Sequence, residues 1–74
     1  MNDTKEIQRA LTLIGEAKGI VELTLCQEEV DLDNMPENLR GEEAGQRAEG
    51  VVGALGRAAW DCGDAIIACK EAMG

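Results

Sequence analysis

The amino-acid sequence predicts an all-α fold, a two-helix antiparallel hairpin that associates into a helical bundle of two or more copies. Apolar residues recur three and four positions apart over residues 4–33 and again over residues 42–73, which is the spacing of amphipathic helices. A proline interrupts this pattern, and residues 34–41 form the predicted linker. With 74 residues and a mass of 7.9 kDa, we expect a single domain spanning residues 1–74.

The first predicted helix carries one apolar stripe along its length. Leu13 and Ile20 flank the stripe, and other positions carry the charged residues Lys5, Arg9, Glu16, Glu22 and Glu29. The helix is expected to end near Asp33, because the residue before Pro36 is pushed out of the helical region. The members of the stripe are Ile7, Leu11, Ile14, Ala17, Val21 and Leu25.

The linker is expected to act as a structural clamp. Met35 and Leu39 fold back over the end of the hairpin, and Pro36 stiffens the exit from the first helix. The side chain of Asn34 or Asn38 is expected to satisfy free backbone groups at the helix ends. These five residues form the predicted clamp.

The second predicted helix begins after Gly41, which is expected to take the backbone angles of a cap. Apolar residues then repeat in a 4-3-4-3 spacing, typical of a close-packed helical seam. This predicted seam consists of Ala44, Ala48, Val51, Leu55, Ala58, Cys62, Ala65, Cys69 and Ala72. A second row at intervals of seven contains Val52, Ala59, Ile66 and Met73, and another side carries Gly53, Gly56, Trp60, Gly63 and Ile67.

A helix that is apolar over more than half its circumference cannot be covered by one partner helix in water. A chain below about 80 residues also rarely gains more than a few kcal/mol from its own core. We therefore expect a homo-oligomer, with a dimer as the simplest form. The expected oligomer interface consists of Val52, Leu55, Gly56, Ala59, Trp60, Gly63, Ile66 and Ile67.

Glycines inside the second helix indicate close approach of two helix backbones, because each costs about 1 kcal/mol relative to alanine in a helix interior. Gly15 and Gly19 on the first helix form a matching notch. With the chain reversing near residue 38, position 60 lies opposite position 16. We expect Trp60 to lie across this notch, in its own chain or in a partner's.

The net charge of −8 disfavours binding to nucleic acid, whose phosphates need cationic side chains. The acidic residues concentrate around the linker, where Arg40 is the only cation among them. This region is either a solvated connection or a contact site for a basic protein surface. The acidic residues are Glu28, Glu29, Asp31, Asp33, Glu37, Glu42 and Glu43.

Three cysteines, an odd number, and a start without an apolar signal segment indicate a cytoplasmic protein with reduced thiols. The longest apolar run, residues 50–56, is too short to span a membrane. Cys26, Cys62 and Cys69 are dispersed in the hairpin, so we expect no metal site and no cofactor.

The composition also argues against an enzyme. Without His, Ser or Tyr, the usual acid-base and acyl-transfer arrangements cannot be assembled. Residues 31–42 place four carboxylates at ligand positions of a calcium loop, but Met35 and Pro36 occupy positions that need a polar ligand and a glycine.

A small anionic ligand such as a signalling nucleotide is the alternative binding partner. Trp60 would stack on a base between subunits, and Arg47 or Arg57 would bind a phosphate. The competing interpretation pairs Arg57 with Asp61 one turn away and places Trp60 in an interface.

The segment Asp33-Asn34-Met35-Pro36-Glu37-Asn38-Leu39, followed by a helix rich in Ala and Glu, resembles the linker of small helical proteins encoded by phages and prophages. The resemblance implies two helices around this linker and no enzymatic role. The sequence differs from these proteins after Gly41, where it has Glu42-Glu43-Ala44 and they commonly have Ser-Glu-Arg. By analogy with such proteins, we expect an accessory protein that acts by protein binding, including inhibition of host factors.

Overall fold

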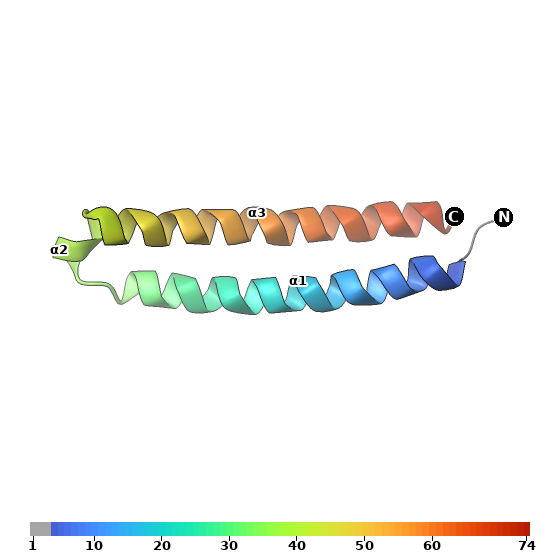
Figure 1. The fold of residues 1–74 in the computed structure, drawn as a ribbon, viewed down its shortest axis with the longest axis horizontal. Helices are drawn as coiled ribbons and strands as arrows, with labels where there is room; N and C mark the ends of the chain where they lie inside the picture. The colour runs from blue at the N-terminus through green and yellow to red at the C-terminus, as the bar shows by residue number, and fades with distance from the viewer. Residues whose placement is uncertain (1–3) are drawn as a thin grey trace.

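The computed structural model describes residues 4–74 and contains three helices: α1 (Thr4–Asp33), α2 (Glu37–Arg40) and α3 (Glu43–Ala72). The long helices α1 and α3 lie side by side and run in opposite directions, with α2 at one end of the rod and the start of α1 and the end of α3 at the other (Figure 1). No strand occurs among residues 4–74. The prediction of an all-α fold is therefore confirmed.

The protein is a rod that is one helix pair thick. Its principal extents are 59 × 14 × 13 Å, and the radius of gyration is 16.8 Å. A compact domain of this length has a radius of gyration of about 11 Å. The rod shape leaves no point in the described chain where a side chain has neighbours on every side.

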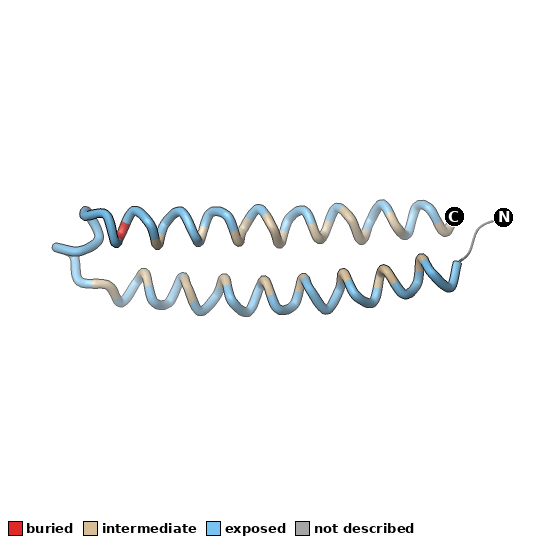
Figure 2. Tube along the Cα trace, in the orientation of Figure 1, coloured by how far each residue is buried: buried red, intermediate tan, exposed pale blue. Residues whose placement is uncertain are grey.

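Half-buried residues of α1 recur at a 4-3 spacing on the side that faces α3 (Figure 2). The pattern agrees with the predicted stripe, except that Ala17 is exposed and Lys18 takes its place on the packed side. We call this row the α1 seam, and it continues past the helix to the linker. Its members are Ile7, Leu11, Ile14, Lys18, Val21, Leu25, Glu28, Leu32 and Met35.

The α3 seam, the row of α3 that faces α1, differs from the predicted seam by a rotation of the helix. Four residues belong to both rows: Ala48, Leu55, Cys62 and Cys69. Each of the other five residues of the α3 seam lies one position later in the sequence than its predicted counterpart. The rotation turns larger side chains toward α1, because Val52, Ile66 and Met73 replace Val51, Ala65 and Ala72 there. The α3 seam consists of Gly45, Ala48, Val52, Leu55, Ala59, Cys62, Ile66, Cys69 and Met73.

The two seams cover each other only in part. No apolar side chain among residues 4–74 is buried, and Gly45 is the one buried residue in that range. Each helix shields one side of the other and leaves the rest of the surface in water. None of the described helices combines the length and the apolar character needed to cross a membrane.

Backbone groups close the connection between the long helices. The carbonyl of Pro36 accepts hydrogen bonds from the amides of Leu39 at 2.9 Å and Arg40 at 3.1 Å, which form the single turn of α2. Met35 is half-buried and Leu39 is exposed. Within residues 4–74, the side chains of Asn34 and Asn38 make no hydrogen bond, so the expected side-chain capping is absent from the described chain.

Two glycines at this end have roles that differ from expectation. Gly41 lies in the ordinary right-handed region, with φ −83° and ψ −7°, so the expected cap geometry is absent. Gly45 is the glycine that the fold requires, because a Cβ atom there would overlap the backbone of Arg40. The start of α3 packs directly against the end of α2, and only a residue without a side chain fits between them.

The different surroundings of Gly45 and Gly50 predict opposite changes in the free energy of unfolding when each is replaced by alanine. Gly45→Ala forces a methyl group into the Arg40 backbone and should lower the free energy of unfolding by about 2 kcal/mol. Gly50→Ala adds a methyl group where no atom lies within 4 Å, so better helix propensity should raise that free energy by up to about 1 kcal/mol. Urea unfolding followed by circular dichroism measures both, and equal effects would contradict the α2–α3 contact.

Candidate functional site

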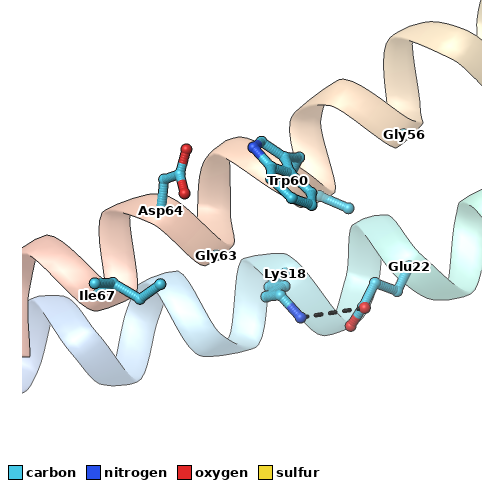
Figure 3. Close-up of a pocket in the computed structure, with 8 residues that line it drawn as sticks. Lys18, Glu22, Gly56, Trp60, Gly63, Asp64 and Ile67 are labelled. Carbon is cyan, nitrogen blue, oxygen red and sulfur yellow. Dashed lines mark hydrogen bonds and ion pairs between the residues drawn. The ribbon is translucent and has the colours of Figure 1, made fainter.

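A groove runs between α1 and α3 near the middle of the rod (Figure 3). Its volume is about 390 Å³, and its walls come from both long helices. The lining is mostly apolar, with a single cation and two carboxylates. The lining residues are Lys18, Glu22, Gly56, Ala59, Trp60, Gly63, Asp64 and Ile67.

The groove exists because glycines interrupt a row of large side chains on α3. Gly56 and Gly63 lie one turn before and after Trp60, and neither carries a side chain to fill the space beside the indole. Trp60 is 74% exposed, and Ile67 also has more than half of its surface in solvent. We call this side of α3 the groove face and define it by Gly53, Gly56, Trp60, Gly63 and Ile67.

Lys18 forms the floor of the groove at a seam position where an apolar residue would ordinarily pack. A Cβ atom at Gly63 would lie 3.7 Å from Cε of Lys18, so the aliphatic stem of the lysine occupies the space that this glycine leaves. The Lys18 ammonium donates a hydrogen bond to Oε2 of Glu22 at 3.2 Å, and both side chains remain partly in solvent. Lys18 therefore separates two apolar stretches of the α1 seam.

The expected oligomer interface divides between two surfaces. Val52, Leu55, Ala59 and Ile66 belong to the α3 seam, where α1 of the same chain half-buries them. Gly56, Trp60, Gly63 and Ile67 line the open groove beside that seam. Ala59 lies on both surfaces, and of these eight residues Trp60 and Ile67 are the ones with more than half of their surface in solvent.

Trp60 does not fill the notch at Gly15 and Gly19 within its own chain. A methyl group at either glycine would meet no atom within 4 Å outside its own helix. Trp60 instead shares the groove with Lys18 and Glu22, further along α1 than position 16, so the chain reverses nearer residue 40 than residue 38.

The arginines expected to bind an anion lie away from the groove. Arg47 donates a hydrogen bond to Glu43 at 2.9 Å near the start of α3, on the solvent side. Arg57 makes no ion pair within residues 4–74, so the expected pairing with Asp61 is absent from the described chain. Lys18, already paired with Glu22, is the only cation that lines the groove.

The cysteines and carboxylates of the described chain form no cluster. Cys62 and Cys69 lie on the α3 seam, and Cys26 is exposed on α1. Within residues 4–74, no group of three or more metal-ligating side chains converges. The chemistry that this site offers is apolar contact framed by mixed charges.

A second apolar surface lies on α1, directed away from α3. Leu13, Ile20, Leu23 and Val30 are all large exposed side chains, and Leu23 is 75% exposed. We call these four residues the outer stripe. A shallow hollow of about 450 Å³ follows its second half, lined by Leu23, Thr24, Cys26, Gln27 and Val30. Sequence reasoning treated Leu13 and Ile20 only as flanks, although Ile20, Leu23 and Val30 are three and seven residues apart.

The charge around the outer stripe is uniformly negative over its second half. Every charged residue within four positions of Leu23 or Val30 is acidic. Lys18 and Arg9 lie nearer the other end of the helix. Of the acidic residues, Glu29, Asp31 and Asp33 are exposed, Glu28 lies half-buried on the α1 seam, and Glu22 pairs with Lys18 in the groove.

Comparison with known proteins adds no relative. The chain matches no protein-family model, no curated protein sequence and no solved structure.

The position of Lys18 on the seam predicts a stabilising substitution. Lys18→Leu replaces a charged side chain at a packing position with an apolar one and should raise the free energy of unfolding by about 1 kcal/mol, or roughly 4–8 °C in Tm. Glu22→Gln is the control, because it removes the ion pair and leaves the seam unchanged. Since exposed pairs contribute little, this control should change Tm far less. A decrease in Tm for Lys18→Leu would contradict the placement of Lys18.

Proposed function

We propose that this chain is a small non-enzymatic module, a helical hairpin that associates with itself and acts by binding proteins. The observation that carries the proposal is that residues 4–74 bury no apolar side chain, while eight large apolar residues are exposed. Exposed apolar patches of this kind mark surfaces that other chains cover.

The surface area supports a partner of the size of a second copy. The chain exposes 5510 Å², whereas a compact monomer of 7.9 kDa exposes about 4,400 Å². The excess of about 1,100 Å² is comparable to the roughly 800 Å² that each partner contributes to a standard interface. Covering the groove face would bring the exposed area toward that of an ordinary folded protein.

The two exposed apolar surfaces fit different occupants, because their charges differ. The groove face has both signs of charge nearby, with the three cations Lys18, Arg57 and Lys70 among five carboxylates, so a copy of the same chain meets cations there as well as acids. Two outer stripes facing each other would instead bring together the exposed carboxylates of Glu29, Asp31 and Asp33 from both copies, with no cation near them in the sequence. We assign the groove face to self-association.

For the outer stripe we propose a basic amphipathic helix of a partner protein. Such a helix would cover Leu23 and Val30 with its apolar side and place lysines or arginines against the exposed carboxylates of Glu29, Asp31 and Asp33. The negative surround repels nucleic acid and anionic membranes. The resemblance of the linker to phage and prophage proteins supports an accessory role in the host cytoplasm, with inhibition of a host protein as one form of it.

Native mass spectrometry tests self-association. We expect masses that are multiples of 7.9 kDa at micromolar concentration, without an added ligand. Trp60→Asn removes the largest exposed side chain of the groove face and should raise the dissociation constant by about tenfold or more. Leu23→Asn is the matched control on the outer stripe and should leave that constant nearly unchanged. A monomeric parent chain would overturn the proposal.

A synthetic amphipathic helix tests the outer stripe. A peptide of about three heptads, with leucine at the packing positions and lysine elsewhere, should bind the chain, whereas a peptide with glutamate in place of lysine should not. Leu23→Asn combined with Val30→Asn should weaken binding by about tenfold or more, and Trp60→Asn should not. Isothermal titration calorimetry measures all four cases. Equal affinity for both peptides would contradict the assignment.

A further inference from the structure

The groove face carries a large projection and a bare recess on the same side of one helix. Trp60 projects with 74% of its surface exposed. Methyl groups at Gly53 and Gly56 would meet no atom within 4 Å, so both glycines border open space. Gly53 precedes Trp60 by seven residues, which is two helical turns or about 10 Å along the axis.

We propose that a second copy of this chain docks on the groove face in antiparallel orientation, so that each Trp60 lies against the partner's Gly53. This inference deepens the proposed self-association and depends on it. The two-fold axis passes between residues 56 and 57, midway between positions 53 and 60. Gly56 lies next to the axis, where the absence of a side chain lets the two α3 helices approach closely.

Steric complementarity selects the antiparallel arrangement. A two-fold interface places the same patch of both copies face to face, so every projection needs a recess within that patch. In a parallel pair, Trp60 would meet Trp60 and Gly53 would meet Gly53, which leaves a collision at one level and a void at the other. In the antiparallel pair, the two-fold symmetry places the indole of each Trp60 in the recess at Gly53 of the other copy.

The charge distribution along the rod selects the same orientation independently. Residues 19–59, which include the α2 end, contain nine acidic and three basic residues, a net charge of −6. Residues 4–18 and 60–74 contain five acidic and four basic residues, a net charge of −1. An antiparallel pair places each strongly acidic half beside the nearly neutral half of its partner, whereas a parallel pair aligns the two acidic halves.

The opposite side of the α3 seam offers no comparable fit. We call it the Ala face, and its largest side chain is Val51, which is 40% exposed, so it carries no projection of the size of Trp60. Tryptophan dominates binding energy at protein interfaces far more often than alanine does. The Ala face consists of Ala44, Val51, Ala54, Ala58, Ala65, Ala68 and Ala72.

Pulsed electron paramagnetic resonance measures the orientation. A nitroxide is attached at Asn38→Cys, which lies in α2 at the end of the rod, after Cys26→Ser, Cys62→Ala and Cys69→Ala remove the native thiols. In the antiparallel dimer the two labels lie at opposite ends of a pair of rods 59 Å long, at a separation of about 50 Å. A separation below about 30 Å, as in a parallel pair, would overturn the inference while leaving self-association intact.

Two adjacent substitutions identify the face. Gly53→Leu fills the recess and should raise the dissociation constant of the dimer by about tenfold or more, as measured by sedimentation equilibrium. Ala54→Leu places the same side chain on the Ala face and should change that constant by less than about twofold. Leucine favours the helix more than glycine does, so loss of association in Gly53→Leu cannot come from unfolding. The reverse pattern would assign the interface to the Ala face and overturn the inference.

A monomeric parent chain gives a third outcome, which overturns the proposed self-association and this inference together. Circular dichroism of the thiol-free variant shows whether it keeps the helix content of the parent. If it does not, Cys62→Ser and Cys69→Ser replace the alanine variants, because both thiols are only half-buried and would otherwise take the label.

Discussion

Two helices side by side can shield only one side of each other, and this geometric limit determines most of what the protein presents to solvent. Packing along a single row leaves each seam residue with water on its outer edges, so Leu55 and Ile66 are half-buried at best. A third or fourth helix supplies the missing cover in ordinary bundles. Any pair of helices therefore leaves outward-facing surfaces such as the outer stripe and the groove face exposed. The sequence determines which side chains these surfaces carry.

The amino-acid sequence predicts the helices well because the signals are local. Pro36 ends α1, and the 3-4 spacing places both long helices close to their observed bounds, Thr4–Asp33 and Glu43–Ala72. The rotation of α3 is harder to predict, because two rows of the same spacing differ by one residue. Side-chain size and the contact of Gly45 with α2 decide between them, and that contact joins residues of different elements. On α1, too, neighbouring rows with the same spacing differ by one residue, so Ala17 was expected on the seam position that Lys18 occupies.

The glycines separate into two groups that the sequence alone does not distinguish. Gly45 is required inside the chain, where a methyl group would strike Arg40. Gly53 and Gly56 meet nothing within the chain, although each costs helix propensity of about 1 kcal/mol. Sequence reasoning identified the glycines as sites of close approach, but the approach that it expected between α1 and α3 does not involve these two. In the proposed dimer a partner chain gives them a physical reason, and Trp60 is the side chain of the groove face that is large enough to fill the space.

The central claim is that folding of this rod is linked to its association with other chains. Thermal unfolding followed by circular dichroism, repeated over about a hundredfold range of protein concentration, tests this linkage most directly. If the folded chain is covered by a second copy, mass action raises Tm steadily with concentration. A Tm that stays constant over the whole range would show that the helix pair is stable alone, and would contradict the account.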